Sequence, residues 1–255
     1  MVKLGESGST LKKRLAPKVK LEAHPAGIDF LTLDWSIKNP QTVTFEHGKS
    51  SLRIDKFLSV LATQDHDFAI EGIFEINVSC TLSATDFLEH EQARLLLTNP
   101  LKNALRHGSR AVIPRHLPRI HARDLYQYQF STHSYVPQDA NYVPTAEEWL
   151  QLPGNTTWEL YADRVFLSIN IDRHQSKADK STPDVYLISY NFQSENNYYR
   201  GNVADEFRTK WLSKLASSLV TVAEQRAKRE AEVRALGIPV DEEYVDPTLP
   251  TTVSR

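Results

Sequence analysis

Alternating apolar and polar positions recur along much of the chain and predict β-strands. Residues 30–37 alternate apolar side chains with Thr32, Asp34 and Ser36. Residues 68–80 place mostly apolar side chains on one face and Glu, Asn and Ser on the other, and residues 165–172 and 185–192 repeat this pattern on both sides of a charged loop. Because a period of two residues is typical of half-buried strands, we predict antiparallel strands here, the last two joined as a hairpin.

Apolar positions three to four residues apart predict helices instead. The first helix is expected from Asp86 to Gly108, with a break or kink at Pro100. A short second helix follows Thr145, whose hydroxyl suits an N-cap. The third and longest is expected over residues 203–236, where Phe207, Trp211 and Leu215 recur every four residues.

Two segments are less decisive. Residues 125–130 alternate Leu and Gln with Tyr and Phe, which predicts a strand, whereas residues 51–61 fit a strand or a helix. In total, the sequence predicts about seven or eight strands, a mid-chain helix and a long amphipathic C-terminal helix. We therefore expect an α+β or mainly-β fold with an antiparallel sandwich or barrel-like core.

Composition divides the chain into three parts. Residues 1–27 carry Lys12, Lys13 and Arg14 among several glycines and prolines, which predicts a basic flexible arm. Residues 28–237 are expected to form a single globular domain, with a subdivision near 137–157 as the alternative. Residues 238–255 are acidic and contain Pro and Thr, which predicts a flexible tail.

The bulk properties limit the environment and the partners. The net charge is −2, so attraction to a polyanion must come from a local patch. The single cysteine excludes an internal disulfide and suits a reducing compartment. No stretch approaches the roughly 20 apolar residues that span a bilayer. We therefore expect an intracellular protein, in the cytoplasm or in a virion, with no membrane span.

The most basic segment runs from Lys102 to Arg123 and contains no acidic residue. Guanidinium groups bind phosphate bidentately, and aromatic residues follow directly, so this run predicts contact with nucleic acid. The alternative is that the arginines pair with the acidic tail or with neighbouring subunits. The arginines in question are Arg106, Arg110, Arg115, Arg119 and Arg123.

Signals for catalysis or for a cofactor are weak. His107, His116 and His121 lie within the run and His133 follows it, but the arginines between them would repel a cation, so we expect no metal site. The sequence contains no nucleophile elbow and no phosphate loop, and no cofactor is expected. Cys80 lies on the apolar face of its strand and is expected to be a buried thiol. Asp184 and Glu195 flank one strand, and such carboxylates can hold the cation of a nuclease.

Three classes of function remain. The first is a structural protein that self-associates, as a homo-oligomer or a larger assembly, and contacts RNA or DNA through Lys12, Lys13, Arg14 and the arginine run. Viral coat, nucleocapsid and matrix subunits are of this class. The second is an adaptor that docks a partner protein on Phe207, Trp211 and Leu215, although the same stripe suits core packing. The third is an enzyme, such as a metal-dependent nuclease, with a site assembled from scattered residues.

Overall fold

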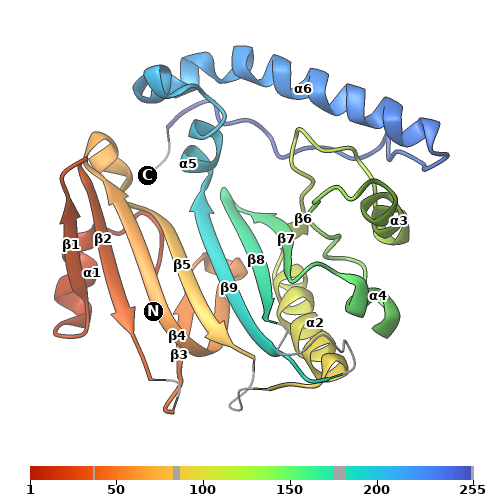
Figure 1. The fold of residues 1–255 in the computed structure, drawn as a ribbon. Coiled ribbons are helices and arrows are strands. Elements are labelled where there is room, and N and C mark those ends of the chain that lie inside the picture. Colours follow the sequence, from red (N-terminus) through yellow and green to blue (C-terminus); the bar gives the residue numbers. More distant parts are fainter. Residues whose placement is uncertain (37, 83–86, 175–181, 254–255) are drawn as a thin grey trace.

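An antiparallel β-sheet is the framework of the chain in the computed structural model, which describes residues 1–36, 38–82, 87–174 and 182–253. Its strands follow the order β1-β2-β4-β5-β9-β8-β7-β6, and β3 pairs with β4 beside this path. β1 and β6 lie at opposite ends of this order, so the fold is α+β with an open sheet and not a closed barrel (Figure 1). The strands are β1 Lys20–His24, β2 Ile28–Asp34, β3 Gln41–Phe45, β4 Leu52–Asp65, β5 Ile73–Thr81, β6 Arg110–Ala111, β7 Asn155–Ala162, β8 Val165–His174 and β9 Val185–Ser194.

The two faces of the central strands differ in polarity, as the alternation in the sequence predicts. Ile169 and Ile188 are buried on one face. On the other face, the register places Ser79, Ser189 and Asn170 side by side in one row across β5, β9 and β8. The predicted hairpin is confirmed, because β8 and β9 pair from Val165–Ser194 to His174–Val185. The ambiguous segment 51–61 is part of β4.

Helices lie beside and above the sheet (Figure 1). α2 follows the predicted mid-chain helix and packs Ala93, Leu97 and Leu101 into the same core as the strands. Pro100 lies inside α2 without ending it, and Asp86 lies outside the described residues. Thr145 caps α4 in a capping box with Glu148, as predicted. The helices are α1 Gly8–Leu15, α2 His90–Arg106, α3 Ala122–Thr132, α4 Ala146–Gln151, α5 Glu195–Arg200 and α6 Trp211–Ala235, with 3₁₀ turns η1 Gly48–Ser50, η2 His66–Glu71 and η3 Asp205–Lys210.

The strand predicted over residues 125–130 is wrong, because this segment belongs to α3. Leu125, Tyr128 and Gln129 are buried together, which is the spacing of one helix face. Gln129 is buried because its amide oxygen accepts a hydrogen bond from Gln138. A polar residue on the buried face concealed the helical period.

The first 27 residues differ from the expected flexible arm. They form α1 and β1, and both Val2 and Leu11 are buried in the main core. The Gly5 amide donates to the Ile73 carbonyl at 2.9 Å, and the Ile73 amide donates to the Glu6 carbonyl at 2.9 Å. The N-terminal segment is therefore joined to the start of β5.

The C-terminal region also differs from its prediction. The long helix α6 starts at Trp211 and follows the 3₁₀ turn η3, so it begins later than residue 203. Beyond α6, the described part of the tail runs back beneath the helix toward the other end of the sheet (Figure 1). Ile238 and Leu249 pack into two hydrophobic clusters, so residues 238–253 are not a loose tail.

Candidate polyanion-binding site

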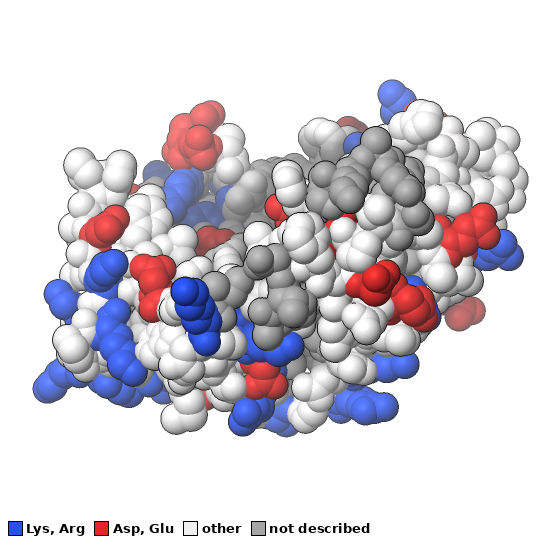
Figure 2. Space-filling model, turned by 60° about the horizontal axis from the view of Figure 1, so that its bottom comes forward, with Lys and Arg blue, Asp and Glu red and all other residues white. Residues whose placement is uncertain are grey.

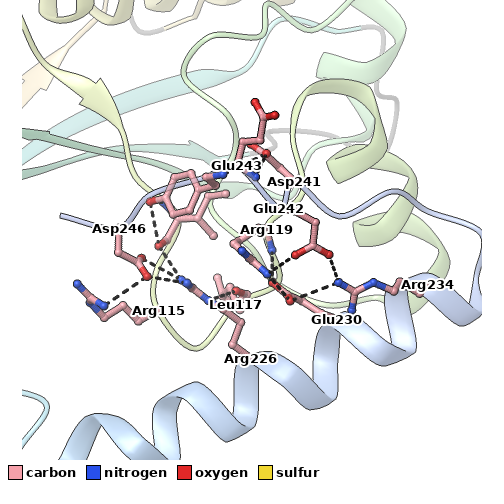
Figure 3. A network of polar contacts seen from close by, with 12 residues as sticks. Arg115, Leu117, Arg119, Arg226, Glu230, Arg234, Asp241, Glu242, Glu243 and Asp246 are labelled. Atoms are coloured by element: carbon pink, nitrogen blue, oxygen red, sulfur yellow. Dashed lines mark hydrogen bonds and ion pairs between the residues drawn. The ribbon is translucent and has the colours of Figure 1, made fainter. Parts of the chain in front are cut away.

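The part of the arginine run from Arg115 to Arg119 lies between α6 and the C-terminal tail (Figure 3). Arg115 lies 3.3 Å from Asp246 and donates to the Pro247 carbonyl at 2.5 Å. Arg119 donates to both carboxylate oxygens of Glu230, at 2.7 and 2.9 Å, and to Glu242 at 3.1 Å. Arg110 donates to the carbonyl of Val245 at 2.8 Å. These three arginines are therefore held by α6 or by the tail.

Arg226 of α6 ties the same region together from the helix side. Its guanidinium donates to the Asp246 carboxylate at 2.7 and 3.1 Å, and to the carbonyl of Leu117 at 3.0 Å. Asp246 thus accepts from two arginines, one on the run and one on α6 (Figure 3). The structure places these arginines in the pairing with the acidic tail that was the alternative interpretation of the run.

His121 adds a further ionic contact between the run and the tail. Its Nδ1 lies 3.6 Å from Asp139 and its Nε2 lies 2.7 Å from Asp241. The carboxylate of Asp139 is the main reason that the pKa of His121 is raised, and Asp241, which is hydrogen-bonded to the ring, acts in the same direction against the effect of burial. The imidazole is therefore held between two carboxylates, one of them from the tail.

The remaining predicted cations lie apart from this network. Arg123 is exposed on α3 and lies 3.7 Å from Glu148. Arg14 pairs with Glu6 at 2.8 Å, whereas Lys12 and Lys13 are exposed on α1. Arg106 lies on the last turn of α2, on the wall of a large cavity. Arg115 and Arg119 also line a cavity, of about 210 Å³, but its wall contains their acidic partners Glu230 and Asp246. Arg106 is thus the predicted contact that the structure brings to the larger hollow, apart from these acidic partners.

The aromatic stripe of the C-terminal helix is mostly internal. Trp211 and Leu215 are buried in a cluster with Phe166 and Tyr199. Phe207 lies in η3, is partly exposed, and is covered by the ammonium of Lys214 at 5.1 Å from its ring. Two of the three predicted anchors therefore stabilise the fold, and the surface expected for an adaptor is not formed by this stripe.

A cavity of about 610 Å³ lies between α2, the start of β4, the end of β5 and the middle of β9. The start of β4 and the end of β5, which line it, lie at the lower end of the sheet in Figure 1. The polar residues of the helical wall are Asn99, Lys102, Asn103 and Arg106. Asn99 and Asn103 are four residues apart, as are Lys102 and Arg106, so these side chains lie on one side of α2. We refer to this cavity as the basic pocket.

The opposite wall of the basic pocket is the irregular first half of β4. The register with β5 shifts between Phe57 and Ser59, and Lys56 just before the shift has a positive φ of 57°. This bulge directs the Lys56 ammonium to the carbonyl of Leu82, 3.1 Å away. Sequence reasoning missed Lys56 because a bulge leaves no clear signal in an alternating pattern.

The charges of the basic pocket are strongly unequal. Among the described residues, Arg53, Lys56, Lys102 and Arg106 line it together with a single carboxylate, that of Asp55. Asp55 already accepts from Arg53 at 3.2 Å and from the Thr42 hydroxyl at 2.6 Å. In Figure 2, which brings the lower end of Figure 1 forward, blue side chains gather along the lower and left margins of the view. The pocket therefore offers cationic donors to an anionic ligand.

The inner side of the basic pocket contains Cys80 and Tyr190, whose side chains are buried. Burial, aided by the negative charge of Asp55, raises the pKa of the Cys80 thiol to about 12. A thiol at this pKa stays protonated at neutral pH and is a poor nucleophile. The expectation of a buried thiol is confirmed, and the pocket is suited to binding more than to covalent catalysis.

The carboxylates considered for a nuclease do not meet. Asp184 and Glu195 lie at opposite ends of β9, so roughly 35 Å of strand separates them. Glu195 is paired with Arg164 at 2.9 Å and accepts from the Tyr161 hydroxyl at 2.8 Å. Within the described ranges, no group of three His, Cys, Asp or Glu side chains could hold a metal ion.

Comparisons with other proteins do not extend this picture. No family model, curated protein or solved structure matches the chain. Among the described residues, no helix is both long enough and apolar enough to cross a membrane.

Proposed function

We propose that the chain is a structural protein that self-associates and binds nucleic acid, with the basic pocket as its phosphate-contacting site. The observation that carries this proposal is the excess of cations among the described residues that line the pocket, four against one carboxylate. Lys102 and Arg106 are exposed on its rim. Across the part of the chain that the structure describes, neither has an ion-pair partner, unlike Arg115 and Arg119.

Physical reasons favour a polyanion at this site. The chain as a whole has a net charge of −2, so a nucleic acid would be attracted only where cations are locally concentrated. Concave walls of one charge sign focus the electrostatic field, and an arginine fork can bind a phosphate through two hydrogen bonds. Asn99 and Asn103 add amide groups that can donate to phosphate or to bases.

Salt-dependent binding of single-stranded RNA tests the nucleic-acid part of the proposal. We expect the Lys102→Ala/Arg106→Ala variant to bind a fluorescent RNA more weakly than the wild type. The slope of log affinity against log salt should fall by roughly 0.7 for each phosphate that the variant no longer neutralises. Fluorescence anisotropy over a salt series measures both quantities.

Lys12→Ala/Lys13→Ala is the matched control, because it removes the same charge from exposed positions on α1. We expect this control to keep the salt slope of the wild type. A reduced slope in the control, with an unchanged slope in the pocket variant, would move the RNA contact to α1.

Light scattering after size exclusion, with absorbance at 260 and 280 nm, tests self-association and bound nucleic acid separately.

A further inference from the structure

β1 is an edge strand of the sheet that is open to solvent. It pairs with β2 from Lys20–Thr32 to His24–Ile28 and ends the strand order on that side (Figure 1). All five of its residues are exposed. At the other end of the sheet, β7 is covered by β6 and by a parallel bridge between Gln138 and Trp158. An exposed edge strand offers backbone N–H and C=O groups to another strand.

We propose that β1 pairs antiparallel with β1 of a second copy of this chain, about a two-fold axis at Leu21. The inference rests on the self-association in the proposed function and names the surface that carries it. In an antiparallel pair, residues directly opposite one another project on the same face of the sheet. When a two-fold axis relates the two strands, one residue therefore lies at the axis, directly opposite the same residue of the other copy.

The charge pattern of β1 selects this register. With the axis at Leu21, Lys20 of each copy faces Glu22 of the other, which gives two opposite-charge pairs. With the axis one residue later, Glu22 would face Glu22, and like charges directly opposite are destabilising. The sequence Lys-Leu-Glu is therefore self-complementary in one register and repulsive in the neighbouring one.

The apolar contact at the axis favours the same register. Leu21 is 40% exposed, although its neighbour on β2, Leu31, is fully buried. Opposite side chains in an antiparallel pair lie about 5 Å apart at Cβ, so the two Leu21 side chains would cover one another. The pair is isologous and uses up the edge that forms it, so this contact closes as a dimer. Larger assemblies would be built from such dimers.

Reciprocal charge reversal tests the pairing without disturbing the core, because Lys20 and Glu22 are exposed. Lys20→Glu alone and Glu22→Lys alone should each raise the dimer dissociation constant by about tenfold or more, since each creates two like-charge pairs. Mixing the two variants restores both opposite-charge pairs and should restore the dimer. Analytical ultracentrifugation at matched concentrations measures all three samples.

A crosslink tests the register directly. Leu21→Cys should form a disulfide-linked dimer under mild oxidation, because its two copies face one another across the axis. Ala23→Cys is the control, because its two copies would be roughly 13 Å apart along the strands and should stay unlinked. Cys80 is buried and should not compete.

The outcomes distinguish this inference from the proposed function. A wild type that stays monomeric at high concentration would overturn both β1 pairing and self-association, and would leave RNA binding by the basic pocket as a separate result. Self-association that persists in Lys20→Glu and in Glu22→Lys, without crosslinking of Leu21→Cys, would overturn only the pairing through β1.

Discussion

At the scale of single residues, the position of Glu159 on β7 changes the acidity of its carboxyl group. Burial raises the pKa of Glu159 to about 7, and the hydroxyl of Ser168, which donates to it at 2.7 Å, opposes the rise. In the unfolded chain its pKa is about 4.3. Between these two values the folded chain binds a proton that the unfolded chain does not. The free energy of unfolding therefore falls as the pH rises through this window.

Glu159→Gln keeps the shape of the side chain and removes the titration. We expect the variant to be more stable than the wild type above pH 7, by roughly 3 kcal/mol, and to approach the wild type below about pH 4. Urea unfolding at a series of pH values measures the difference. Ser168→Ala should move the wild-type window to higher pH, because it removes the bond that favours the charged form. Parallel pH profiles for wild type and Glu159→Gln would contradict this assignment.

For individual elements, the sequence is most informative where local chemistry and packing agree. Thr145 caps α4 as predicted because the capping box involves only residues a few positions apart. The β8–β9 hairpin is predictable because one face of each strand is buried and the other is polar. α3 resembles a strand in the sequence because the burial of Gln129 depends on Gln138, a partner outside the helix.

The packed N-terminal segment escapes prediction for a similar reason. Its lysines suggest solvent exposure, and the few apolar residues that hold it, such as Val2 and Leu11, are too widely spaced to form a pattern. The junction with β5 depends on Gly72, whose φ is +64°. A Cβ at this position would lie 2.8 Å from the carbonyl oxygens of Gly5 and Glu6. The glycine thus permits the close approach of two backbone segments.

Gly72→Ala should therefore lower the free energy of unfolding by more than the cost of placing an alanine at a positive φ. Gly237→Ala is the matched control, since its φ is +76° and no atom lies within 4 Å of the added Cβ. We expect a loss of about 1 kcal/mol for the control and about 3 kcal/mol for Gly72→Ala. Urea unfolding of both variants gives the comparison. Equal losses would show that the N-terminal segment moves aside without cost.

Across the whole molecule, the candidate site could be predicted only in part. Lys102 and Arg106 are four residues apart, so a helix through them places both on one face, and the basic segment that contains them is evident in the sequence. Arg53 and Lys56 reach the same pocket from β4, about fifty positions earlier, through a tertiary arrangement that no local pattern encodes. The other arginines of the run are equally suited to phosphate by sequence. The acidic partners of Arg115 and Arg119 lie on α6 and in the tail, more than a hundred residues later.

Removal of the tail tests its role in the whole molecule. In a chain that ends at Gly237, Arg115 and Arg226 would lose Asp246, and both guanidinium groups are largely buried. Breaking a buried pair by removing one partner costs about 3–5 kcal/mol, whereas loss of a loose tail would change stability by about 0.5 kcal/mol or less. We expect the larger loss in urea unfolding, and a smaller loss of the same sign for Asp246→Asn in the full chain. Glu243→Gln, an exposed neighbour, should leave the unfolding midpoint unchanged. If the shortened chain and Asp246→Asn were both as stable as the wild type, Arg115 and Arg226 would not depend on the tail to compensate their charges. The arginines beside α6 would then again be candidate phosphate contacts.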